Sequence, residues 1–160
     1  MRTATDWLAE LVSFDTTSRN SNLALIDRVE SYLAELGAEC HRIESPDGTK
    51  ANLHAVLGPH VDGGVVLSGH TDVVPVDGQD WSTDPFTLTE RDGKLYGRGS
   101  CDMKGFIACA LAKAPSFAKA ALKRPVHFAF SYDEEIGCLG APDMIRQMAG
   151  HAPRPVACNG

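Results

Sequence analysis

The sequence predicts an α/β fold in which helices flank a mostly parallel mixed sheet. Segments with helical spacing of apolar residues alternate with short apolar runs, and polar loops bound the runs at 65–68 and 126–131. A short continuous apolar run is typical of a parallel strand that is buried on both faces. A length of 160 residues suits one domain with a substantial core.

Two amphipathic helices are expected near the N-terminus. Apolar residues within 7–12 recur with helical spacing, and Thr5 precedes them as a candidate N-cap. Apolar positions within 25–36 repeat that spacing. Gly37 follows them and can end the helix, because glycine readily adopts the left-handed conformation found after helix C-termini.

Three strands are expected next along the chain. Segments 40–44 and 52–57 have strand-like patterns and are separated by the turn sequence Pro46-Asp47-Gly48. The third strand covers 65–68, and we expect it to be buried on both faces. A polar loop is expected at 75–85.

The second half of the chain continues the alternation of strands and helices. Asp92-Gly93 is a strong hairpin signal, and we expect this hairpin to extend the sheet as an antiparallel addition. The elements that follow are a helix at 106–112, a strand at 126–131, a helix at 139–148 ended by Gly150, and a strand that begins at 155–158.

Composition excludes several classes of function. The chain is 43% hydrophobic and 22% charged, which is typical of a globular protein. Its net charge of −6 and lack of a basic run give no electrostatic support for nucleic-acid binding, and no apolar run reaches membrane-spanning length. The 5 cysteines form no Cys-x-x-Cys pair. Their odd number and the lack of a signal peptide predict a cytoplasmic protein.

His70 and Asp72 follow the apolar run at 65–68. Ligands in open α/β sheets bind beyond the carboxyl ends of strands, so His70 is placed where a metal ligand would be useful. Residues two apart in an extended segment point to the same side, so Asp72 can accept a hydrogen bond from the imidazole and orient it. The alternative is an ordinary polar loop after a strand.

Asp102 lies in the glycine-rich segment 97–105. Glycine lets the backbone approach a site closely, and a carboxylate at such a point can bridge two cations. The alternative is that Asp102 caps the apolar helix that follows it. Cys101 beside it is a weak candidate for a nucleophile, because no activating base is arranged near it in the sequence.

Glu134 and Glu135 follow the strand at 126–131. Neighbouring carboxylates repel each other unless a cation or a proton lies between them. One carboxylate can therefore bind a metal while the other serves as a general base. The alternative is a solvated acidic turn. Together with His70, these carboxylates form a ligand set suited to a hydrolytic divalent metal, above all zinc.

Three blocks of the sequence resemble the signature blocks of a known family. They are Ser-Gly-His-Thr-Asp-Val-Val-Pro (68–75), Tyr-Gly-Arg-Gly-Ser-Cys-Asp-Met-Lys-Gly (96–105) and Ser-Tyr-Asp-Glu-Glu-Ile-Gly (131–137). The family is that of acetylornithine deacetylase, succinyl-diaminopimelate desuccinylase and glutamate carboxypeptidase, which are dinuclear zinc hydrolases. The blocks occur in order with intact spacing, and the resemblance covers nearly the whole chain.

The resemblance implies a role for each site residue. His70 would bind one metal ion, Glu135 would bind the other and Asp102 would bridge both. Asp72 would orient His70, and Glu134 would act as general base and acid. The implied cofactors are two divalent ions, zinc or alternatively cobalt. The implied substrate is a small N-acyl amino acid, with N-acetylornithine hydrolysis in arginine biosynthesis as the expected reaction.

The resemblance also implies that residues 1–160 are the amino-terminal part of a zinc-peptidase-like catalytic domain. Two further metal ligands of the family, an acidic residue in a Gly-Glu-Pro-Thr-like block and a late histidine, have no counterpart in this sequence. The lid and dimerisation domain has none either, whereas full-length relatives are expected to be homodimers. We therefore expect the 160-residue chain to be a poor catalyst. Desuccinylase activity, dipeptidase activity and a non-catalytic fragment are the alternatives.

Overall fold

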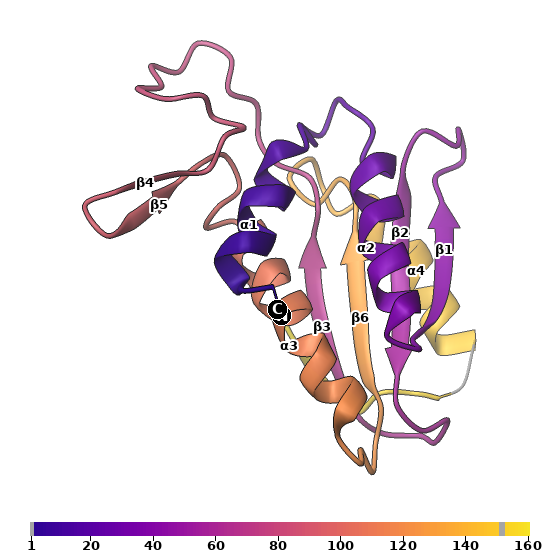
Figure 1. The fold of residues 1–160 in the computed structure, drawn as a ribbon. Coiled ribbons are helices and arrows are strands. Elements are labelled where there is room, and N and C mark those ends of the chain that lie inside the picture. Colours follow the sequence, from indigo (N-terminus) through magenta and orange to yellow (C-terminus); the bar gives the residue numbers. More distant parts are fainter. Residues whose placement is uncertain (1, 151–152) are drawn as a thin grey trace.

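A five-stranded sheet with helices on both faces organises the described residues, 2–150 and 153–160, of the computed structural model (Figure 1). The strand order is β1-β2-β6-β3-β7. The helices are α1 (Ala4–Ser13), α2 (Leu23–Glu35), α3 (Lys104–Lys119) and α4 (Ala141–Gly150). The strands are β1 (Glu39–Glu44), β2 (Ala51–Leu57), β3 (Val65–His70), β4 (Thr89–Arg91), β5 (Lys94–Tyr96), β6 (Val126–Ser131) and β7 (Ala157–Asn159).

The sheet is mixed, with β2 as its reversed strand. Strand β2 pairs antiparallel with both β1 and β6, whereas β3 pairs parallel with both β6 and β7. The mostly parallel mixed sheet predicted from the sequence is confirmed. Parallel neighbours need a long crossover, and helix α3 lies in the connection from β3 to β6.

Most of the core lies on one face of the sheet, beneath α1, α2 and α3 (Figure 1). The side chains of Phe128 and Phe130 point into this core from β6, while Ala129 between them joins a small cluster beneath α4 on the opposite face. This alternation is the two-residue period of a strand. All seven positions of β2 are buried, but β3 is only partly buried. The expectation that the third strand is buried on both faces holds only in part: Val66 is buried in the small cluster beneath α4, whereas Val65, Leu67 and Ser68 stay partly exposed.

The helix boundaries differ from the sequence predictions for local reasons. Helix α1 is capped by Thr3 and not by Thr5. The Thr3 hydroxyl accepts from the Asp6 amide at 3.1 Å, and the Asp6 carboxylate accepts from the Thr3 amide at 2.8 Å. This reciprocal capping box begins the helix earlier than its apolar pattern indicates. Helix α3 extends beyond the predicted 106–112 to Lys119, because Ala114 continues its buried face.

The hairpin of β4 and β5 forms as the Asp92-Gly93 signal predicts, with positive φ at both residues. It forms a separate two-stranded sheet, so the expectation that it would extend the main sheet is wrong. Figure 1 shows it standing away from the main sheet on the long loop after β3. Within residues 2–150 and 153–160, no helix combines the length and hydropathy needed to cross a bilayer.

Candidate metal centre

Two neighbouring parallel strands bring the predicted site residues to one edge of the sheet. His70 ends β3 and lies in register with Ser131, which ends β6. The next residue, Thr71, donates from its amide to the Ser131 carbonyl at 2.8 Å, and its hydroxyl donates to the same oxygen at 2.9 Å. The segments that follow the two strands are therefore held side by side at the carboxyl edge, where ligands bind in open α/β sheets.

His70 is the buried centre of the site, with 5% of the residue exposed. Its Nε2 atom lies 3.0 Å from Asp102 Oδ1 and 3.8 Å from Glu134 Oε2. Its Nδ1 atom lies 3.0 Å from the Asp72 backbone carbonyl and 3.5 Å from Asp72 Oδ1. Burial alone would lower the pKa of His70, but the contacts with Asp72 and Asp102 outweigh it and raise this pKa to about 9.

Asp72 is a buried carboxylate that joins three segments. Its oxygens accept hydrogen bonds from the Ser18 hydroxyl at 2.7 Å, the Glu134 amide at 3.0 Å and the Glu135 amide at 3.2 Å. Burial alone would raise the pKa of Asp72, but its contact with His70 and these donors lower it below its usual value. Asp72 is therefore held as an anion against the imidazole of His70.

Asp102 reaches the site from the glycine-rich loop before α3. Its side chain is 76% exposed, and its Oδ1 atom meets His70. The N-cap position of α3 is Met103, without a side-chain cap, so the alternative that Asp102 caps this helix is wrong. Gly99 has a φ of +76°, and a Cβ atom there would lie 2.6 Å from a Val73 methyl group. Glycine therefore allows the loop to pack closely against the segment after β3.

Lys104 anchors the same loop from within the core. The residue is fully buried, and its Nζ atom donates to the Phe14 carbonyl at 2.8 Å. Burial lowers the pKa of Lys104 to about 8, although the negative charges of Asp15 and Asp72 partly oppose this shift. No sequence signal marks this lysine as buried, because a single lysine before an apolar helix resembles an exposed residue.

Glu134 and Glu135 complete the acidic side of the site. Among the described residues, His70, Glu134 and Glu135 form a group whose potential ligand atoms all lie within 4.8 Å of one another. Asp102 is not a member of that group, although it contacts His70. Burial raises the pKa of Glu135, and the neighbouring carboxylates of Asp102, Asp72 and Glu134 raise it further, partly opposed by His70. Both glutamates are thus within reach of one cation.

The donor set fits a divalent metal ion. A neutral imidazole and several carboxylates are the ligands that zinc uses in hydrolytic sites. The carboxylates of Asp102 and Glu134 lie on the Nε2 side of His70, while Asp72 occupies the Nδ1 side, as the outer partner of a metal-binding histidine does. A metal ion and the Nε2 proton would compete for the same nitrogen, so the raised pKa of His70 reflects an environment that favours a cation.

A cavity of about 210 Å³ opens beside Asp102 and Glu135. Arg98 also lines it, and its guanidinium group lies 5.1 Å from the centre of the Trp81 ring. The cavity therefore combines a fixed cation with two carboxylates. Such a mixture suits a small ligand that carries both signs of charge.

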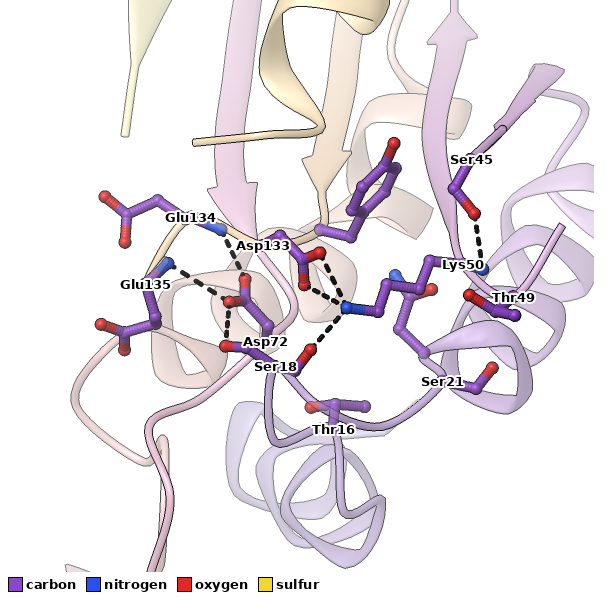
Figure 2. A network of polar contacts seen from close by, with 12 residues as sticks. Thr16, Ser18, Ser21, Ser45, Thr49, Lys50, Asp72, Asp133, Glu134 and Glu135 are labelled. Carbon is purple, nitrogen blue, oxygen red and sulfur yellow. Dashed lines mark hydrogen bonds and ion pairs between the residues drawn. The ribbon is translucent and has the colours of Figure 1, made fainter. Parts of the chain in front are cut away.

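Several residues that hold the site were not found in the sequence analysis. Figure 2 shows Lys50 between Asp133 and Ser18, with the side chains of Glu134 and Glu135 directed away from it. Asp133 has a φ of +55°, and its carboxylate contacts the Lys50 ammonium group at 2.6 and 2.7 Å. No local pattern marks these residues, because the partners lie in segments that meet only in the folded chain.

Comparison with known proteins identifies the family. The sequence profile of Peptidase family M20/M25/M40 matches residues 66–159, which is more than half of the chain. The chain belongs to this family. The matched residues run from β3 to β7 and include all five predicted site residues.

Curated relatives of this M20 chain include acetylornithine deacetylases. The enzyme from Myxococcus xanthus is 43% identical over 150 residues, which cover 91% of this chain and 38% of that relative. The enzyme from Klebsiella pneumoniae (strain 342) is 43% identical over 122 residues, which cover 76% of this chain and 32% of that relative. The chain therefore spans about a third of the length of these relatives.

Solved structures share the fold of this M20 chain. Human carnosine dipeptidase 1 superimposes with a TM-score of 0.81 at 26% identity, covering 98% of this chain and 38% of that chain. The M20 family metallo-carboxypeptidase Sso-CP2 from Sulfolobus solfataricus gives a TM-score of 0.78 at 22% identity, with coverages of 98% and 37%. A Zn-dependent exopeptidase from Parabacteroides distasonis gives 0.66 at 22% identity, with coverages of 97% and 57%.

Proposed function

We propose that this protein is a zinc-dependent amidohydrolase that cleaves the amide bond of an N-acyl amino acid. The observation that carries the proposal is the group of His70, Glu134 and Glu135, whose ligand atoms lie within 4.8 Å of one another at the carboxyl edge of the sheet. Asp102, whose Oδ1 atom lies 3.0 Å from His70 Nε2, adds a further carboxylate beside this group. Membership of the M20 family and a solved neighbour described as Zn-dependent support the choice of zinc.

The proposed site holds two divalent ions. His70 would hold one ion, Glu135 would hold the other and Asp102 would be shared between them, with cobalt as an alternative to zinc. When bound, such ions would lower the pKa of a bound water to about 7 and polarise the carbonyl of the scissile amide. The residues of this chain provide the ligands, the orientation and the proton transfer.

Glu134 is the proposed general base and acid. Its amide is fixed by Asp72 while its carboxylate stays 44% exposed, so the side chain can reach a substrate. The carboxylate accepts a proton from the attacking water and then delivers it to the departing amine nitrogen. Asp72 orients the His70 ring through contacts on the Nδ1 side.

N-acetylornithine is the proposed substrate, with ornithine and acetate as products and arginine biosynthesis as the setting. The names of the curated relatives support this choice. N-succinyl-diaminopimelate and dipeptides are the alternative substrates, and the name of human carnosine dipeptidase 1 supports the latter. We further propose that residues 1–160 form the amino-terminal part of the catalytic domain, in keeping with their share of the relatives' length.

A chimera tests the proposed function directly. The chain replaces the segment that it matches in the Myxococcus xanthus acetylornithine deacetylase, and the zinc-loaded chimera is assayed on the three substrate types. We expect turnover of N-acetylornithine above the other two, and loss of turnover in the Glu134→Gln chimera. A folded, zinc-loaded chimera that hydrolyses none of them would contradict the proposal and favour a non-catalytic fragment.

A further inference from the structure

The turn that carries Glu134 and Glu135 is fixed by an ion pair outside the metal site. Lys50 lies just before β2, and its ammonium group contacts both oxygens of the Asp133 carboxylate, at 2.6 and 2.7 Å. The side chains of Lys50 and Asp133 are 14% and 9% exposed. A largely buried ion pair of this geometry resists separation, because removal of Lys50 leaves the buried Asp133 carboxylate uncompensated.

The backbone at Asp133 explains why the turn needs such a partner. Its φ of +55° lies in the left-handed region, which non-glycine residues seldom adopt. That conformation lets the following amides of Glu134 and Glu135 turn toward Asp72, to which they donate at 3.0 and 3.2 Å. The Asp133 side chain points the other way, toward Lys50 (Figure 2).

The contacts close into a ring. Lys50 also donates to the Ser18 carbonyl, and the Ser18 hydroxyl donates to Asp72 at 2.7 Å. Lys50 therefore holds the turn through the Asp133 carboxylate. It also holds Ser18, whose hydroxyl binds Asp72. A second residue of the same strand edge helps: the side-chain oxygen of Asn52 accepts from the Tyr132 amide at 3.2 Å.

We propose that Lys50 and Asp133 are positioning residues that set the glutamate turn and Asp72 in place for metal binding and catalysis. This inference rests on the proposed function, because it concerns the same site. Neither residue touches the proposed metal ligands with its side chain; both act through the backbone of the turn and through Ser18. Groups that orient metal ligands typically change metal affinity or activity by roughly 10- to 100-fold when they are removed.

Zinc affinity and amide exchange of the 160-residue chain test the proposal. Lys50→Met leaves Asp133 unpaired in a buried place, so it is compared with Lys50→Met/Asp133→Asn, which removes both charges. Arg42→Met is the matched control. Arg42, on β1, also pairs with acidic residues, in this case Asp27 and Glu30 of α2, but it lies outside the glutamate turn. Zinc affinity is measured by competition with a chromophoric chelator, and exchange of the Glu134 and Glu135 amides by NMR without metal.

We expect the double variant to stay folded, to bind zinc roughly 10- to 100-fold more weakly and to exchange both amides faster. Arg42→Met should change neither quantity beyond about twofold, as is usual for a surface ion pair. A folded double variant with wild-type zinc affinity and wild-type amide exchange would overturn the inference. If the wild-type chain binds no zinc, the proposed function fails, and the amide exchange alone then decides whether the ion pair positions the turn.

Discussion

Asp72→Asn is the most informative single substitution at the site. It keeps the size of the side chain but removes its charge and replaces one acceptor oxygen with a donor group. In the wild-type chain, the two oxygens accept from the Ser18 hydroxyl and from the amides of Glu134 and Glu135. The asparagine oxygen can still accept from one of the two backbone amides. The asparagine NH₂ group then faces the other amide, which is also a donor, so that hydrogen bond is lost. The Ser18 hydroxyl can rotate and accept from the NH₂ group instead.

The expected cost follows from this count of partners. One hydrogen bond to a charged group is lost, which is worth about 1.5–3 kcal/mol, and the remaining bonds become neutral and weaker. We therefore expect the free energy of unfolding to fall by roughly 2–4 kcal/mol at pH 7. The partner of His70 also loses its charge, so zinc affinity should fall by about 10- to 100-fold.

The pH dependence has a defined sign. The pKa of Asp72 is lowered in the folded chain, so its carboxylate contributes stability above the unfolded pKa of about 3.9. That contribution is lost as the pH falls through the folded pKa. The difference in unfolding free energy between wild type and Asp72→Asn should therefore be full near pH 7 and shrink at acid pH.

Urea unfolding with EDTA present and a separate zinc titration measure the two effects. Asp84→Asn is the control, because Asp84 also accepts from an amide, that of Phe86, and from a hydroxyl, that of Thr87, but at an exposed turn. It should cost less than about 1 kcal/mol. The reasoning is refuted if Asp72→Asn unfolds within about 0.5 kcal/mol of the wild-type chain and binds zinc equally well.

Three further outcomes are expected. In the chimera, Glu134→Gln should abolish turnover and leave zinc affinity nearly intact, whereas Glu135→Gln should lower zinc affinity too. Equal zinc loss in both variants would contradict the assigned roles. Because the pKa of His70 is raised to about 9, zinc binding at pH 7.5 should release about one proton from its imidazole. Calorimetry in buffers of different ionisation enthalpy measures this release, and a release of no proton would contradict the prediction. Phe128→Ala should lower the free energy of unfolding by about 3–5 kcal/mol, because the ring is fully buried in the main core, and a urea midpoint near that of the wild-type chain would exclude this.

Much of the fold was predictable because its signals are local. The strand at 126–131 matches β6 exactly in extent, and the Asp92-Gly93 hairpin forms where its turn sequence indicates. One local signal was overlooked, because Thr3 and Asp6 cap each other and begin helix α1 earlier than predicted. The position of the hairpin outside the main sheet depends on tertiary packing, which no local pattern records.

The sequence by itself predicted an α/β sheet and a set of candidate site residues, with His70, Glu134 and Glu135 placed at or after strand ends, because residue type and hydrophobic period can be read along the chain. Only the tertiary structure decided how they meet. It brought Asp102 to the Nε2 atom of His70 and placed Glu134 and Glu135 in one group with His70. It also paired Lys50 with Asp133, which lies 83 residues away along the chain. Such contacts have no local signature, because they depend on strand order and on turns that become adjacent only when the sheet forms.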